Sequence, residues 1–221
     1  MRYKGVLFDL DGTLVNSAQD MYTALNLTLT EVAFPIVSYA QVCSWVGNGI
    51  DMLVKRGLSG GMDLNPELPQ TLIDLATATF REHYAQLAGQ YANLYPNVEI
   101  GLASLSSFSK ALITNKDRVF TEPLLEQLKL SAYFDAVVCG DDGLKKPAAA
   151  PLIKACELME LKPSEVIMVG DSKSDILAAQ NANIDAVALT YGYHQGVNLQ
   201  DYNPQYLCDN FLDIIPILTQ R

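Results

Sequence analysis

Short apolar runs that alternate with helix-like segments are the dominant pattern of this chain. Five runs lack the polar–apolar alternation of a half-exposed sheet, so they predict buried parallel strands over residues 5–10, 111–114, 134–139, 166–170 and 186–190. The segments between the later runs predict helices over residues 119–130, 150–160 and 174–181. This alternation favours an α/β fold in which a Rossmann-like parallel sheet carries helices on both faces.

Residues 17–89 follow a different pattern, because apolar side chains recur there at helical spacing and no strand-like run occurs. The two apolar stripes consist of Tyr22, Leu25, Leu29 and Val32, and of Leu72, Leu75, Ala78 and Tyr84. Ser17 is a candidate N-cap of the first helix, and Asn183 is a candidate left-handed residue after a later one. We therefore expect an all-helical cap domain, residues 16–89, inserted into a core domain made of residues 1–15 and 90–221.

The composition restricts the class of partner and the compartment. The formal net charge of -10 argues against a nucleic-acid partner, because contacts to a phosphate backbone require a basic face. A small phosphorylated metabolite stays compatible with this charge. The four cysteines are scattered, which favours reduced thiols. No apolar run could span a membrane, and the first strand begins too close to Met1 for a signal peptide, so we expect a cytoplasmic protein. The pattern does not indicate an oligomeric state.

Polar side chains follow four of the expected strands at the points where those strands end. In chain order they are Asp9, Asp11 and Thr13; Thr114 and Asn115; Asp141, Asp142, Lys145 and Lys146; and Asp171, Ser172 and Asp175. Open α/β sheets bind their ligands outside the carboxyl ends of the strands. We therefore expect these groups to meet at one edge of the sheet.

The acidic residues of this group require cations. Two like charges about 4 Å apart repel each other by about 4 kcal/mol at an effective dielectric constant near 20. Lys146 offers one cation, and hard carboxylate oxygens suit Mg²⁺ as another. Carboxylates, Mg²⁺, a lysine and a hydroxyl beside a backbone amide are the parts that phosphoryl transfer requires.

Four ordered motifs resemble those of the haloacid dehalogenase-like hydrolases. They are DLDGTLV at residues 9–15, ITNK at 113–116, KKP at 145–147 and VGDSKSD at 169–175. The position of the helical insertion also resembles the cap of that family. Asn16 and Ala149 depart from the family pattern, in which aspartate and proline are common, but neither change removes a reacting group. Three further segments are similar to the bacterial phosphoglycolate phosphatases within the family: WVGNGIDMLVKR at 45–56, LYPNV at 94–98 and LTYGY at 189–193.

The resemblance implies a role for each motif residue. Asp9 would attack phosphorus and become an aspartyl-phosphate, while Asp11 would serve as general acid and then as general base. Gly12, Thr114 and Asn115 would lie at the phosphate, where the Thr114 hydroxyl and the Asn115 amide would hold phosphoryl oxygens.

The resemblance also implies how the charges are balanced. Lys146 would neutralise the transferring group and fix Asp9. Mg²⁺ would be held by Asp9, by the backbone carbonyl of Asp11 and by Asp171, with Asp175 ordering the ligands or a bound water.

The cap offers few groups for a second charge on an anionic substrate. Gly47, Asn48 and Gly49 could present backbone amides, and Arg56 could supply a fork that suits a carboxylate. Asn48 and Arg56 are therefore candidate substrate-binding residues. The alternative is that the glycines only break a helix and that the cations of the cap are solvated.

Together these features predict a Mg²⁺-dependent phosphomonoesterase that acts on a small phosphorylated acid, 2-phosphoglycolate, and releases glycolate and phosphate. Two alternative enzymatic functions are a phosphatase of another small sugar phosphate and a β-phosphoglucomutase-like phosphoryl transferase with the same core. A non-enzymatic alternative is a phosphate-sensing binding module on an inactive scaffold.

Overall fold

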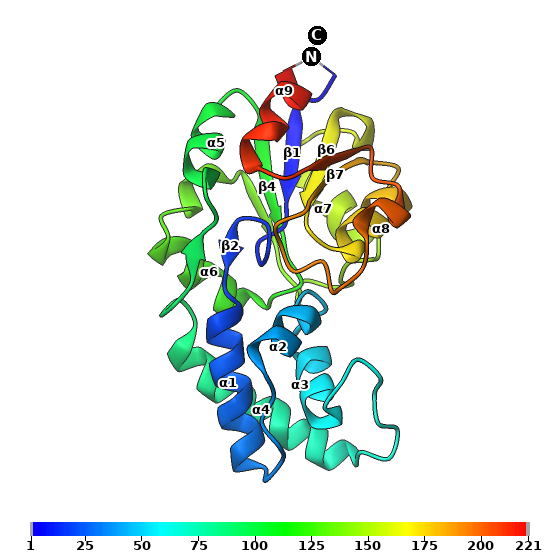
Figure 1. The fold of residues 1–221 in the computed structure, drawn as a ribbon. Coiled ribbons are helices and arrows are strands. Elements are labelled where there is room, and N and C mark those ends of the chain that lie inside the picture. The colour runs from blue at the N-terminus through cyan, green and yellow to red at the C-terminus, as the bar shows by residue number, and fades with distance from the viewer. Residues whose placement is uncertain (1, 220–221) are drawn as a thin grey trace.

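The computed structural model describes residues 2–219, and its core is one parallel sheet of six strands in the order β5-β4-β1-β6-β7-β8 (Figure 1). The strands are β1 (Gly5–Phe8), β4 (Ser109–Ile113), β5 (Ala136–Val138), β6 (Val166–Gly170), β7 (Asp185–Leu189) and β8 (Tyr206–Cys208). The five strands expected from the sequence are confirmed, with ends shifted by one or two residues. The edge strand β8 was not expected, because its three residues are too few to stand out as an apolar run.

The register of the central strands brings their carboxyl ends into line. Phe8 at the end of β1 pairs with Leu112 of β4 and with Val169 of β6. Asp9 therefore lies one residue beyond this level, and Thr114 and Asp171 lie two residues beyond it on the two neighbouring strands. Three of the four sequence motifs reach the same edge of the sheet for this reason.

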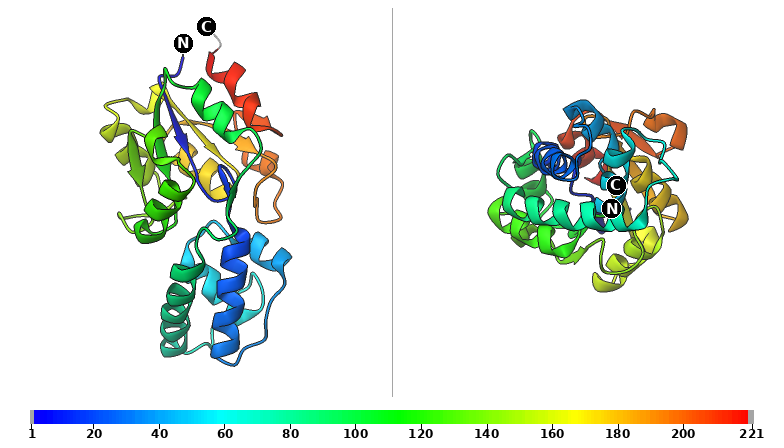
Figure 2. Two further views of the ribbon diagram at one scale, coloured as in Figure 1. Left: turned by 90° about the vertical axis from the view of Figure 1, so that its left-hand side faces the viewer. Right: turned by 90° about the horizontal axis from the view of Figure 1, so that it is seen from below.

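Helices cover both faces of the sheet, as expected (Figure 2). One hydrophobic cluster joins Val6 and Phe8 of β1 to α5 (Val98–Ser104), α6 (Arg118–Gln127) and α9 (Ile214–Thr219). A second cluster joins Leu7 to α7 (Ala150–Leu158) and α8 (Lys173–Asn181). Successive side chains of a strand point to opposite faces, so β1 contributes to both clusters and is buried along its whole length.

Four helices form the cap, which extends from the carboxyl edge of the sheet in Figures 1 and 2. They are α1 (Ala18–Glu31), α2 (Tyr39–Trp45), α3 (Ile50–Ser59) and α4 (Gln70–Leu87). A separate hydrophobic cluster, which includes Leu25, Leu29, Trp45, Phe80 and Tyr84, holds them together.

The stripe expected on α4 is partly wrong. Leu75 is 58% exposed, whereas Ala76, Phe80 and Tyr84 are buried. These three residues follow each other at intervals of four, and this spacing also defines one face of a helix. The buried face therefore passes beside Leu75 rather than through it.

The chain passes between core and cap twice, and the two passages pair with each other. The two-residue strands β2 (Val15–Asn16) and β3 (Asn93–Leu94) form a short antiparallel ladder, with Val15 opposite Leu94. The exact limits of the cap, residues 16 and 89, remain a prediction. Four short 3-10 turns complete the described elements: Ser131–Tyr133, Pro163–Glu165, Leu199–Tyr202 and Phe211–Asp213.

Both predicted helix-end residues lie where expected. Asn183 follows α8 with φ of 55°, so the left-handed residue is confirmed. Ser17 is the N-cap residue of α1, as expected, although its side chain makes no capping hydrogen bond. The hydroxyl of Ser17 instead donates to Oδ1 of Asp11 over 2.5 Å.

Over residues 2–219, none of the helices has the length and apolar character needed to cross a membrane. All four cysteines are free thiols. The cytoplasmic location stays a prediction.

Candidate active site

Lys146 joins residues from three of the four motifs at the carboxyl edge of the sheet. Its ammonium donates to Oδ1 of Asp9 over 2.7 Å and to Oδ1 of Asp175 over 2.7 Å. A third N–H donates to the carbonyl of Ile113 over 2.6 Å. All three donors of the ammonium therefore have acceptors, and the side chain is held in one orientation.

Three carboxylates gather around this lysine. Oxygen atoms of Asp9, Asp171 and Asp175 lie within 4.8 Å of one another, and all three residues are buried. Burial, with repulsion from Asp175 and Asp11, raises the pKa of Asp9 to about 7, although the ammonium of Lys146 opposes this shift. Burial also raises the pKa of Asp171 well above its ordinary value, and Asp9 and Asp175 add to the rise. One ammonium does not neutralise three carboxylates, so the cluster retains excess negative charge.

The geometry around Asp171 fits a divalent cation with oxygen ligands. The hydroxyl of Thr13 donates to Oδ1 of Asp171 over 2.7 Å, and the backbone N–H of Tyr193 donates to Oδ2 over 2.6 Å. These bonds fix the carboxylate beside Asp9. A buried, charged group of oxygen ligands is the donor set that Mg²⁺ prefers.

The contacts of Asp175 suit a residue that orients the cluster. Its Oδ2 accepts hydrogen bonds from the backbone N–H and the hydroxyl of Ser172, at 3.0 and 2.7 Å. Its Oδ1 accepts from Lys146, so both of its oxygens are engaged. Asp175 thereby closes a capping box at the start of α8 and also holds the lysine.

Glycine is required where the first motif approaches this cluster. Gly12 has φ of 97°, and a Cβ atom there would overlap the carboxylate of Asp171. The same holds for a Cβ atom at Gly192, which precedes Tyr193. Gly12 therefore belongs to the site through its backbone, which lies against the carboxylate of Asp171.

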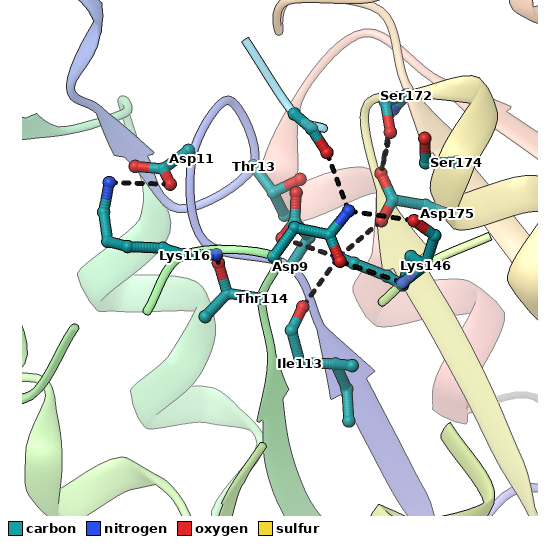
Figure 3. A network of polar contacts seen from close by, with 12 residues as sticks. Asp9, Asp11, Thr13, Ile113, Thr114, Lys116, Lys146, Ser172, Ser174 and Asp175 are labelled. Atoms are coloured by element: carbon teal, nitrogen blue, oxygen red, sulfur yellow. Dashed lines mark hydrogen bonds and ion pairs between the residues drawn. The ribbon is translucent and has the colours of Figure 1, made fainter. Parts of the chain in front are cut away.

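The side chain of Asp11 lies apart from the acidic cluster. Its Oδ1 accepts from Ser17, and its Oδ2 forms an ion pair with the buried ammonium of Lys116 at 2.9 Å. Figure 3 shows Asp9 between this ion pair on one side and Lys146 with Asp175 on the other. Asp9 thus has the acidic cluster on one side and a second carboxylate, of a type suited to proton transfer, on the other.

Thr114 and Asn115 stand where the second motif meets the cap. The Thr114 oxygen accepts from the backbone N–H of Lys116 over 3.1 Å. The side-chain amide of Asn115 donates to the carbonyl of Lys146 over 3.0 Å and to that of Gly47 over 2.9 Å. Its oxygen accepts from the backbone N–H of Lys146. The side chain of Asn115 therefore joins two core motifs to the cap loop.

A cavity lies between the core and the cap beside these residues. The core contributes Asp9, Asp11, Thr114, Asn115 and Lys116 to its lining, and the cap contributes mainly apolar groups: Met21, Val46, Gly47, Gly49, Ile50, Leu53, Phe80 and Tyr84. The reacting groups expected from the first two motifs thus share one cavity.

The structure does not bring Asn48 and Arg56 to the lining of this cavity. Arg56 is buried in the cap and donates from Nη1 to the carbonyl of Trp45 over 2.7 Å, at the end of α2. Asn48 donates to the hydroxyl of Ser174 over 3.1 Å and accepts from Gln195 over 2.8 Å. Both side chains hold the glycine-containing loop in place rather than face the cavity.

Lys116, Tyr84 and Tyr193 were not among the functional residues expected from the sequence. Lys116 is the last residue of the ITNK motif, and its ammonium also donates to the hydroxyl of Tyr84 in the cap over 2.8 Å. A lysine three residues after the end of β4, within the ITNK motif, was the available signal. Tyr84 gave no signal beyond its place in an apolar stripe, and Tyr193 gave none beyond its place in the LTYGY segment.

Comparison with known proteins agrees with this arrangement. The sequence profile of the haloacid dehalogenase-like hydrolases matches residues 6–189. The chain belongs to this family of hydrolases. It is 41% identical to the phosphoglycolate phosphatase of Colwellia psychrerythraea over 213 residues, which cover 95% of this chain and 94% of that protein. It is 38% identical to the phosphoglycolate phosphatase of Psychrobacter arcticus over 217 residues, or 96% and 94% of the two chains.

The fold has similar neighbours among solved structures. A crystal structure described as a predicted phosphoglycolate phosphatase from Haemophilus somnus superposes with a TM-score of 0.91 and is 32% identical. The match covers 100% of this chain and 99% of that one. A second structure, from Lactobacillus delbrueckii, has the same TM-score at 21% identity, which shows the shared fold alone.

Proposed function

We propose that this protein is a Mg²⁺-dependent phosphatase that hydrolyses 2-phosphoglycolate to glycolate and inorganic phosphate. The observation that carries the proposal is the position of Asp9 between Lys146 and the Asp171 cluster on one side and the Asp11 carboxylate on the other. The names of the relatives from Colwellia and Psychrobacter support this choice of substrate.

The carboxylates of Asp9 and Asp171 and the backbone carbonyl of Asp11 would hold Mg²⁺. Asp175 would order these ligands or a bound water. The cation would supply positive charge for the phosphoryl oxygens and offset the repulsion within the cluster. The excess negative charge around Lys146 supports this assignment.

The reaction proceeds in two steps in this proposal. A carboxylate oxygen of Asp9 forms a bond to phosphorus while the bond from phosphorus to the bridging ester oxygen breaks, and Asp11 gives its proton to the departing alkoxide. Water then forms a bond to phosphorus, the bond to Asp9 breaks, and Asp11 takes a proton from that water. Lys146 holds the Asp9 carboxylate in place through both steps.

The closed arrangement of core and cap supports the exclusion of bulk water from the reaction. The hydroxyl of Tyr84 and the carbonyl of Gly47 belong to the cap, and both bind residues that follow β4 in the core. A substrate must enter before these contacts form, so we expect the cap to open and close in each cycle.

The test is the release of inorganic phosphate from 2-phosphoglycolate and from a panel of sugar phosphates, with Mg²⁺ and with excess EDTA. We expect the highest kcat/KM for 2-phosphoglycolate and loss of turnover in EDTA. Preference for a sugar phosphate would contradict the proposed substrate. Transfer of the phosphoryl group to a sugar without phosphate release would contradict hydrolysis, and turnover in EDTA would contradict the metal requirement.

A further inference from the structure

Two buried ammonium groups lie at the candidate active site, and their donors are used differently. Lys146 donates to three protein oxygens and has no N–H left for a ligand. Lys116 forms an ion pair with Oδ2 of Asp11 at 2.9 Å and donates to the hydroxyl of Tyr84 over 2.8 Å. An ammonium carries three N–H groups, so one donor of Lys116 has no partner among residues 2–219.

This free donor lies at the cavity between core and cap. Lys116 is the one lysine or arginine among the described residues that line it. The side chain is almost fully buried, and its ammonium is held by Asp11 and by the hydroxyl of Tyr84. The cavity therefore contains a buried ammonium that is paired with Asp11 on the core side and faces mainly apolar side chains on the cap side.

The position of Asp11 determines where the rest of the substrate lies. As the general acid, Asp11 must reach the bridging ester oxygen within hydrogen-bond distance. In 2-phosphoglycolate a single carbon atom separates this oxygen from the carboxylate. The carboxylate is therefore close to the Asp11 side chain, where the ammonium of Lys116 already lies.

We propose that Lys116 determines specificity by donating its remaining N–H to the carboxylate of the substrate. This inference rests on the proposed function and assigns the group that distinguishes a phosphorylated acid from a phosphorylated alcohol. Arg56, the alternative cation of the cap, is bound to the carbonyl of Trp45 and does not line the cavity.

The proposed contact between Lys116 and the substrate carboxylate also involves Tyr84 of the cap. Its hydroxyl comes from α4 of the cap and binds the same ammonium as Asp11 of the core. A carboxylate on Lys116 therefore lies at the junction of the two domains, where its binding favours the closed arrangement.

The test measures binding rather than turnover. The probe is 3-phosphonopropionate, in which a methylene group replaces the bridging oxygen of 2-phosphoglycolate, and the reference is propylphosphonate, in which a methyl group replaces the carboxylate of the probe. Calorimetric titrations with Mg²⁺ present give the two dissociation constants for the wild type, for Lys116→Met and for Lys154→Met. Lys154 is an exposed lysine on α7, so its variant controls for the loss of one positive charge.

We expect the wild type and Lys154→Met to bind 3-phosphonopropionate about 10- to 100-fold more tightly than propylphosphonate, as charge-assisted hydrogen bonds of this kind allow. Lys116→Met should lose most of this preference while it still binds propylphosphonate within about threefold of the wild type. Should this variant fail to fold, Lys116→Gln, which keeps a donor for Asp11, takes its place with the same expectation.

The other outcomes separate the inference from the proposed function. If the wild type prefers 3-phosphonopropionate and Lys116→Met keeps this preference, the role of Lys116 is overturned. The proposed substrate then stands. An equal loss of affinity for both ligands would also overturn the role of Lys116, because the lysine would then act only through the phosphate end of the site. A wild type without any preference would contradict the substrate itself, and the inference with it.

Discussion

Tyr193 is bonded through its backbone N–H to Oδ2 of Asp171, over 2.6 Å, and through its hydroxyl to the start of the cap. The hydroxyl accepts from the backbone N–H groups of Ser17 and Ala18, at 2.8 and 2.9 Å, and donates to Oδ1 of Asn16. One residue thus connects the acidic cluster to the passage between the domains. Two N–H groups at the start of α1 are satisfied in this way.

The first prediction concerns this hydroxyl. Tyr193→Phe leaves the N–H groups of Ser17 and Ala18 without an acceptor, and a buried unsatisfied donor costs about 1–3 kcal/mol. We expect the unfolding free energy to fall by this amount and kcat to fall as well, because Ser17 also holds Asp11. Denaturant titration and steady-state kinetics measure the two effects. Tyr91→Phe, at an exposed tyrosine, should change neither quantity. Unchanged stability of Tyr193→Phe would show that the hydroxyl is not needed at the start of α1.

The second prediction concerns Gly12. The new methyl group of Gly12→Ala would overlap the carboxylate of Asp171, and φ of 97° disfavours any residue other than glycine. A displaced ligand should weaken Mg²⁺ binding by about 10- to 100-fold, the range typical when groups that orient metal ligands are changed. Calorimetric titration with Mg²⁺ measures this affinity. Gly61→Ala is the matched control, because no atom lies within 4 Å of the added carbon. Equal Mg²⁺ affinity in the two variants would contradict the assignment of Asp171 as a ligand.

Five of the six core strands and the acidic edge were accessible from the sequence, because these strands are apolar runs and four of the runs end in a polar motif. Asp9 and Asp171 could be placed together for that reason, since their strands end at the same level of the sheet. Their mutual repulsion also made a cation predictable without coordinates.

The contacts between core and cap could not be predicted in the same way. They depend on the orientation of the two domains, which leaves no periodic pattern in the sequence. Arg56 was chosen from its charge alone, whereas in the folded cap it binds the carbonyl of Trp45. Lys116 was overlooked because its partners, Asp11 and Tyr84, lie far from it in the chain. Ser17 is a similar case, because its type suggested a cap while the fold directs its hydroxyl to Asp11.

The third prediction concerns the pH dependence of stability. The pKa of Asp9 is raised from 3.8 to about 7 by burial and neighbouring carboxylates. Between these pH values the folded protein binds a proton that the unfolded chain has released, so the unfolding free energy falls as pH rises from about 4 to 7 and levels off above. Mg²⁺ offsets the charge of the ionised cluster. We therefore expect Mg²⁺ to raise the melting temperature more at pH 7.5 than at pH 5.5.

Thermal unfolding with Mg²⁺ and with EDTA at both pH values measures this effect. Asp9→Asn should reduce the fall in stability with pH in EDTA, because the titrating group is gone. An equal effect of Mg²⁺ at both pH values would contradict a cation site among the buried carboxylates.

The central claim is that Asp9 is the nucleophile, and phosphate release by Asp9→Asn tests it most directly. Asparagine has nearly the same shape but cannot form the acyl-phosphate, so kcat on 2-phosphoglycolate with Mg²⁺ should fall by at least about 10³-fold while the protein stays folded. Asp63→Asn, at an exposed position in the cap, should keep wild-type turnover. Turnover by Asp9→Asn within about tenfold of the wild type would contradict the account.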